Sequence, residues 1–125
     1  MTESQELVAD VLALLPDGAT WHFHGLDDET LPLMGDYQQI EAGHWQVMVG
    51  PRERQAMLEL LQEEDGDEIF SGAESVTVEF EGQRLMEGFD GMEFVYLSRY
   101  LTVSEAFYTK YFAVDDERVG QAKDW

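Results

Sequence analysis

The feature that most constrains this chain is a large negative charge on a sequence rich in apolar residues. Seven Lys and Arg oppose 27 Asp and Glu, which leaves a net charge of −20 on 125 residues, yet 44% of the residues are apolar. A disordered acidic segment lacks the apolar residues that offset the entropy lost on ordering. A chain of this length fits one domain and buries roughly two-thirds of its unfolded surface. The sequence therefore predicts a folded acidic domain.

The same charge limits the partners. A field of one sign repels nucleic acid and anionic membranes and attracts basic surfaces. The sequence has no cysteine, which excludes disulfide frameworks, thiolate catalysis and cysteine-ligated zinc. Its first residues are acidic, and no apolar run reaches the ~18 residues that a membrane helix needs. We therefore expect a cytoplasmic protein with a basic protein partner and with neither a nucleic-acid nor a membrane partner.

Helical spacing of apolar residues occurs in three segments. A capping-box pattern at Thr2 precedes regularly spaced Leu and Val, which predicts a helix over residues 3–15. Pro51 suits the first position of a second helix, over residues 51–64. Ser104 is a candidate N-cap for a short third helix.

Alternating polar and apolar residues predict strands over residues 20–24, 44–49 and 76–80. Glycines at positions 82, 88 and 91 indicate an antiparallel meander that continues into a strand within residues 92–101. Because helices and strands do not alternate regularly, the predicted class is α+β.

The predicted organisation is a single domain followed by a tail. The α+β domain covers residues 1–114, with a mostly antiparallel sheet of about four to five short strands and about two or three helices. We expect residues 115–125 to form a polar C-terminal tail.

Catalytic signatures are absent from the sequence. It contains no Gly-x-Ser-x-Gly elbow, no Gly-Lys-Ser/Thr phosphate loop and no His-Glu-x-x-His helix. Neither Lys110 nor Lys123 has a carboxylate two residues before it, which excludes the acid-x-Lys element of many metal-dependent nucleases. We therefore expect no enzymatic activity and no cofactor.

His22 and His24 have the one spacing that resembles metal ligation. They share a face of the strand predicted over 20–24, and His44 would complete a three-nitrogen site. We favour the simpler interpretation that these histidines lie on the solvent face of an edge strand, so we predict no metal site. A small enzyme would use the same three histidines.

The helix predicted over 51–64 carries charges that oppose its own dipole. Arg52 and Arg54 lie near its N-terminal end, and acidic residues follow its C-terminal end. In one interpretation these charged groups are simply solvated, and Arg54 reaches Glu53 or Glu59. In the other they belong to a functional patch, because several local rules broken together tend to mark function. We favour an acidic binding patch in this turn, made of Glu63, Glu64, Asp65, Asp67 and Glu68.

A second acidic element lies in the loop predicted over residues 25–36. Its acids have apolar neighbours, and such mixtures are typical of interfaces, where charge speeds association and buried anchors supply affinity. We expect Leu31 and Leu33 to fill the core beneath the loop. The candidate binding residues of this element are Asp27, Asp28, Glu29, Asp36 and Tyr37.

The C-terminal third carries a family resemblance. The run Glu87-Gly-Phe-Asp-Gly-Met-Glu93, then Tyr96-Leu-Ser98, Leu101 and the pair Phe107 and Tyr111, resembles the ends of small immunity proteins from bacterial polymorphic-toxin and contact-dependent inhibition systems. The resemblance covers about 25 residues and carries no functional residue across, because such families share little beyond size, acidity and this turn. It implies a bacterial protein that neutralises a toxin domain by binding it.

Three hypotheses follow for the acidity. The first is an immunity protein that blocks a basic toxin domain, for instance a nuclease, with electrostatic steering of the encounter. The second is a DNA mimic, although mimicry needs acids spaced along an extended surface and these acids are bunched. The third is halophilic adaptation without a partner. We favour the first.

Overall fold

A seven-stranded sheet organises the part of the chain that the computed structural model describes, residues 2–26, 29–63, 66, 69–70 and 72–125. The strand order is β2-β3-β1-β4-β5-β6-β7. Neighbouring strands are antiparallel except β6 and β7, which are parallel. The strands are β1 (Ala19–His24), β2 (Tyr37–Glu41), β3 (His44–Val49), β4 (Ser75–Phe80), β5 (Gln83–Phe89), β6 (Phe94–Leu97) and β7 (Val119–Gln121).

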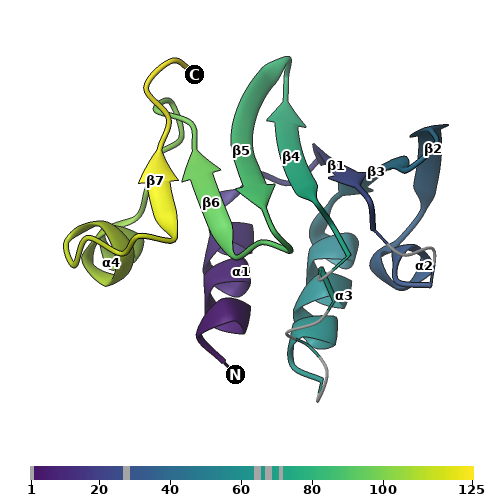
Figure 1. Cartoon of the computed structure of the whole chain (residues 1–125), viewed down its shortest axis with the longest axis horizontal. Helices are drawn as coiled ribbons and strands as arrows, with labels where there is room; N and C mark the ends of the chain where they lie inside the picture. Colours follow the sequence, from purple (N-terminus) through teal and green to yellow (C-terminus); the bar gives the residue numbers. More distant parts are fainter. Residues whose placement is uncertain (1, 27–28, 64–65, 67–68, 71) are drawn as a thin grey trace.

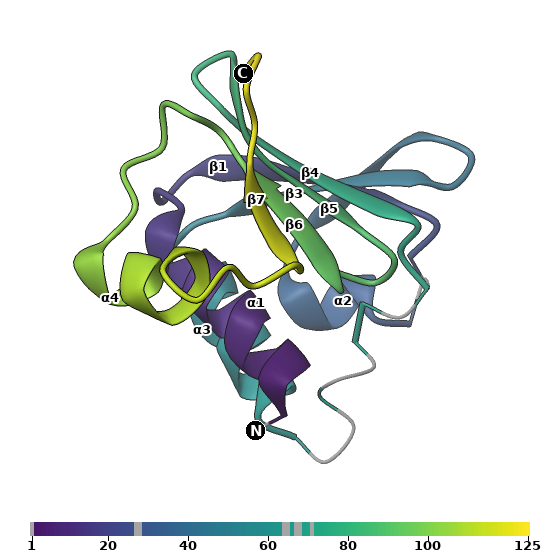
Figure 2. The same ribbon diagram turned by 60° about the vertical axis from the view of Figure 1, so that its left-hand side comes forward.

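The helices lie on one face of this sheet (Figures 1 and 2). Two longer helices pack together beneath the sheet, a short one lies by β2, and the last one lies beside β7. The last helix continues directly into a π-helical segment. The elements are α1 (Glu3–Leu14), α2 (Leu31–Met34), α3 (Pro51–Leu61), α4 (Glu105–Phe107) and the π-helix η2 (Tyr108–Phe112).

The alternation of the strands separates a core face from an open face. Trp21 and Phe23 of β1 are fully buried, whereas His22 between them lies on the opposite face. In register with Trp21 lie Val47 of β3 and Val78 of β4, both buried. One face of the sheet therefore carries the apolar core against the helices, and the helices leave the other face uncovered.

The first helix begins as its sequence predicts. The Thr2 hydroxyl accepts the Gln5 backbone N–H, and the Gln5 side chain accepts the Thr2 backbone N–H, which completes a capping box. Gln5 is itself buried, and its Nε2 donates a hydrogen bond of 2.6 Å to the Leu61 carbonyl at the end of α3. One residue thus starts α1 and caps the last turn of its neighbour.

The α+β class and the mostly antiparallel sheet are confirmed, but the sheet has seven strands instead of four to five. β2 was not predicted because its five residues are all exposed and show no alternation. Residues 115–125 were expected to form a tail, and instead they supply β7, in which Val119 is buried against Val95 of β6. The second helix ends at Leu61 and not at residue 64.

None of the helices in the described ranges has the length and apolar character that crossing a membrane requires. The longest, α1, spans 12 residues, or about 18 Å.

Candidate binding surface

Six of the ten predicted binding residues lie outside the described residues. These are Asp27, Asp28, Glu64, Asp65, Asp67 and Glu68. The structure places the other four, Glu29, Asp36, Tyr37 and Glu63, all of them exposed.

Asp36 and Tyr37 lie at one edge of the sheet. Asp36 links α2 to β2, and Tyr37 begins β2, the terminal strand in the sheet order. The Tyr37 ring contacts Trp45 of β3 edge-on, with centroids 5.5 Å apart, and 42% of the residue remains exposed. A partly exposed aromatic beside a carboxylate has the character of an interface anchor.

Further exposed apolar side chains lie on α2, β2 and β3 at this edge. Leu33 of α2 is 58% exposed, Ile40 of β2 is 48% exposed and Met48 of β3 is 65% exposed. The prediction that Leu33 fills the core is therefore wrong, whereas Leu31 is fully buried as expected. We name this region the β2 edge surface and define it by Leu33, Asp36, Tyr37, Ile40, Glu41 and Met48.

Asp36 stands between two shallow hollows. One, of about 560 Å³, is lined by Pro32, Gly35, Asp36, Tyr37 and Arg52. The other, of about 270 Å³, is lined by Gly18, Asp36, Met48, Gly50 and Glu53. Both give room for side chains of a partner on either side of the Asp36 carboxylate.

Asp36 and Glu63, one from each predicted acidic element, do not lie together. Asp36 lies beside Gly50 and Glu53 at the start of α3. Glu63 follows the end of the same helix and donates its backbone N–H to the Leu60 carbonyl. The 11 residues of α3 separate the two ends by about 16 Å. Asp36 and Glu63 therefore lie at opposite ends of α3.

The charges at the start of α3 have partners of their own. Glu53 accepts the Gly50 backbone N–H at 3.0 Å, and this hydrogen bond is the main cause that lowers the pKa of Glu53. Arg54 binds Asp17 at 2.9 Å and the Leu15 carbonyl at 2.6 Å, and not Glu53 or Glu59, the partners of the solvated alternative. Arg54 thus joins α3 to the segment that follows α1, and Arg52 pairs with Glu53 of its own helix, so these two charges no longer argue for a functional patch.

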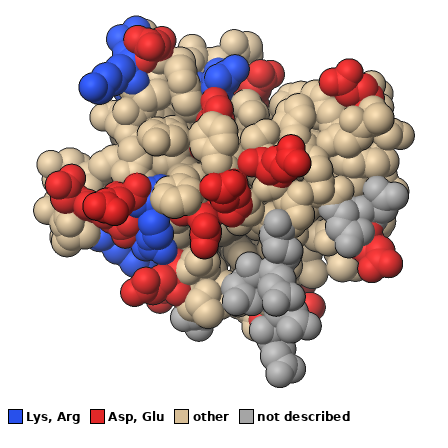
Figure 3. All heavy atoms as spheres, viewed as in Figure 1, with Lys and Arg blue, Asp and Glu red and all other residues tan. Residues whose placement is uncertain are grey.

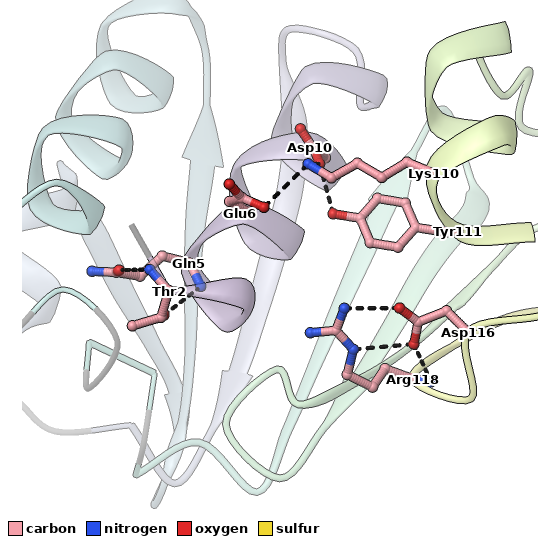
Figure 4. Close-up of polar contacts among 8 residues, drawn as sticks. All are labelled: Thr2, Gln5, Glu6, Asp10, Lys110, Tyr111, Asp116 and Arg118. Atoms are coloured by element: carbon pink, nitrogen blue, oxygen red, sulfur yellow. Dashed lines mark hydrogen bonds and ion pairs between the residues drawn. The ribbon is translucent and has the colours of Figure 1, made fainter. Parts of the chain in front are cut away.

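Most of the cations are neutralised within the chain. Figure 4 shows Lys110 of η2 between Glu6 and Asp10 of α1, at 3.4 and 2.8 Å. Of the seven Lys and Arg, five form ion pairs with carboxylates of the described residues, and only Arg99 and Lys123 do not. The five are Arg52, Arg54, Arg84, Lys110 and Arg118.

The surface charge that remains is accordingly negative. In the view of Figure 3, blue side chains lie next to red ones, whereas several red side chains stand apart from any blue. Among the described residues, no Lys or Arg forms an ion pair with Asp36 or Glu41 of the β2 edge surface. Their charge is available to a basic partner.

The three histidines come together on the open face of the sheet. His22 Nδ1 lies 2.9 Å from His44 Nε2, and the His24 ring stacks on His44. Two nitrogens in direct hydrogen-bond contact leave no space for an ion between them. In the described ranges, no group of three His, Asp or Glu side chains is arranged to hold a metal ion.

Sequence reasoning identified Asp36 and Tyr37 but not Ile40, Glu41 and Met48. The signal for Ile40 and Glu41 was the stretch without alternation before His44. The signal for Met48 was the alternation over 44–49, which places it on the face opposite Val47 and Val49. Comparison of the chain with protein-family models, with curated proteins and with solved structures gives no match.

Proposed function

We propose that this chain is an acidic inhibitor that binds a basic protein partner, in its most specific form an immunity protein that neutralises a cationic toxin domain. The observation that carries the proposal is the distribution of charge. A net charge of −20 coexists with internal pairing of five of the seven cations, so the unbalanced charge is almost wholly carboxylate.

The β2 edge surface supplies what long-range charge alone does not. Electrostatic attraction speeds the encounter, but affinity needs apolar anchors that become buried. Tyr37, Ile40 and Met48 are exposed apolar groups, and Asp36 and Glu41 lie among them. We therefore place the partner at this edge, with its basic side chains on the two carboxylates.

The edge strand itself adds a second means of recognition. β2 pairs with β3 on one side and ends the sheet on the other, so its outer backbone groups are open to a partner. Edge strands are commonly protected by charged side chains, Pro or β-bulges. The sequence Tyr-Gln-Gln-Ile-Glu contains neither Lys nor Pro, and its register irregularity lies between Gln39 and Glu41. The regular part of the edge, Tyr37 to Gln39, is where a partner strand would pair.

Co-expression tests the proposal in cells. The product of the gene immediately upstream is expressed alone and together with this protein, and cell growth is measured. We expect the upstream product to be toxic alone and to be neutralised by the wild-type chain. The double variant Asp36→Asn, Tyr37→Ala should neutralise it less well.

A matched variant controls for the loss of charge. Asp115→Asn removes one carboxylate from the exposed turn between η2 and β7, at the opposite edge of the sheet (Figure 1). Asp115 has a positive φ, which Asn tolerates. If Asp115→Asn and the double variant both neutralise the upstream product fully, the β2 edge surface is not the binding site. If the upstream product is harmless when expressed alone, it is not a toxin that this chain neutralises.

A further inference from the structure

All three histidines of the sequence form one cluster on the uncovered face of the sheet. His22 and His24 lie on β1, and His44 lies on β3 directly opposite His24. His22 Nδ1 is 2.9 Å from His44 Nε2, and the ring centroids of His24 and His44 are 4.2 Å apart. Each imidazole therefore contacts at least one other.

The charged groups that face this cluster are carboxylates. From β4, Glu79 places Oε2 3.8 Å from His22 Nε2. From β2, Glu41 is in register with His44. Arg84 of β5 is in register with Glu79 and is ion-paired with Glu87. The remaining residues in register with His22 and His24 are uncharged, namely Gln46, Thr77 and Ser75.

Burial and proximity determine how the cluster takes up protons. Burial is the largest cause that lowers the pKa of His22; Glu79 opposes this shift, and His44 and His24 reinforce it. The first proton to bind the cluster is therefore attracted by a nearby carboxylate. Each later proton is repelled by an imidazolium that is already present. The cluster resists a second proton more than the first.

The contact between His22 and His44 tolerates one added proton but not two. A hydrogen bond between ring nitrogens needs one N–H and one lone pair. Neutral and singly protonated pairs both supply this combination. After a second proton, both nitrogens carry hydrogen, the bond is lost, and two positive charges lie in contact.

The cluster lies where the β2–β3 hairpin is attached to the sheet. β2 pairs only with β3 in the described sheet, and β3 is held to the remaining strands through β1. A repulsion between His22 of β1 and His44 of β3 therefore acts across this attachment. The hairpin carries Tyr37, Ile40 and Glu41 of the β2 edge surface.

We propose that the three histidines form a proton-operated latch, which holds the β2–β3 hairpin against β1 at neutral pH and loosens it when His22 and His44 are both protonated. The inference rests on the proposed function for its biological meaning, since acid would loosen the surface assigned to the partner. The latch itself is a property of the free protein.

Hydrogen exchange of the free full-length chain tests the latch without any partner. Protection factors are measured at pH 7.5 and pH 5.5, a window above the ordinary range of Asp and Glu. We expect amides of β2 and β3 to lose protection at pH 5.5, by at most about tenfold for each histidine whose pKa is lowered on folding, since pH 5.5 lies about one unit below the ordinary His pKa of about 6.5. Amides of β5 should keep theirs.

Variants assign the effect to the cluster. His44→Gln keeps an amide that can hydrogen-bond His22 but cannot be protonated, so the pH dependence of its β2 and β3 protection should be smaller than in the wild type. The burial of His22 supplies what remains. Glu81→Gln, in the turn between β4 and β5, removes a charge outside the cluster and should retain the pH dependence. An equal pH dependence in wild type and His44→Gln would overturn the proposal.

A direct titration covers the case in which His44→Gln does not fold. The imidazole resonances of the wild-type chain are followed by NMR, and we expect a coupled titration in at least two steps. Three independent histidines titrating at their ordinary pKa, with unchanged β2 and β3 protection, would also overturn the latch. Neither result depends on a toxin, so failure of the latch and failure of the proposed function are distinguishable.

Discussion

The Tyr111 hydroxyl donates a hydrogen bond of 2.6 Å to Asp10 Oδ2, which joins η2 to α1 across 101 residues of sequence. The same carboxylate oxygen accepts from Lys110 Nζ at 2.8 Å. Tyr111 is buried, and its ring packs on Phe107 with centroids 4.6 Å apart. The first helix and the C-terminal segment are thereby fixed to each other by one carboxylate.

Removing the hydroxyl tests this link. Tyr111→Phe keeps the buried ring and loses a hydrogen bond to a charged acceptor, so we expect the free energy of unfolding to fall by about 1.5 kcal/mol. Urea denaturation measures the change. The control is Tyr108→Phe, because Tyr108 is 57% exposed and belongs to the same π-helix. Equal stability of the two variants would show that the Asp10 contact contributes nothing.

The same tyrosine predicts a loss of stability in alkali. Burial, followed by the hydrogen bond to Asp10, raises the pKa of Tyr111 above its usual value. A group whose pKa is raised on folding stabilises the protein below its unfolded pKa, here about 10, and this contribution is lost as pH rises further. Stability should therefore fall above about pH 10, and less steeply in Tyr111→Phe. Identical alkaline profiles of the two proteins would contradict this.

Gly66 occupies a position that a larger residue cannot fill without movement. It is buried, and a Cβ built there would lie 2.1 Å from the Leu61 carbonyl oxygen. That oxygen already accepts the Gln5 side chain. We expect Gly66→Ala to lower the free energy of unfolding by about 1–3 kcal/mol, as overpacking does. Gly43→Ala is a contrast with the opposite cause, because it has open space around the added methyl group but a φ of +76°, so it measures left-handed backbone strain without crowding. A fall in stability for Gly66→Ala therefore reports crowding, since Gly66 has no such φ.

The excess of carboxylates predicts a dependence of stability on salt. Repulsion among like charges is screened over a Debye length of about 10 Å at 0.1 M ionic strength. The melting temperature should therefore rise between low salt and physiological salt and then level off, with the chain folded throughout. A chain that unfolds without molar salt would instead support halophilic adaptation.

The parts of the fold that depend on local sequence were predictable. Thr2 and Gln5 define the start of α1 within a few residues, and the alternation around Trp21 defines β1. β2 and β7 were missed because their stability comes from neighbours, so that Val119 alone is buried in β7. Arg54 finds Leu15 across 39 residues, a contact that no local pattern reveals.

In the candidate site, too, some residues were predictable from local sequence and others are brought together only by the fold. Composition identified Asp36 and Tyr37 as an acidic residue beside an aromatic one. That Met48 lies beside Asp36, and that Glu63 lies at the far end of α3, follows from the packing of strands and helices distant in sequence. Asp36 and Glu63, one from each predicted acidic element, lie at opposite ends of α3.

The most direct measurement is the association rate constant of the purified chain with the upstream gene product, followed by stopped-flow fluorescence from low to high salt. For the wild type, the logarithm of the rate constant should fall steeply as salt rises, because steering is screened. Asp36→Asn should flatten this slope more than Asp115→Asn, and Tyr37→Ala should mainly accelerate dissociation. A rate constant that does not change with salt, or equal effects of Asp36→Asn and Asp115→Asn, would contradict a basic partner docked at the β2 edge surface.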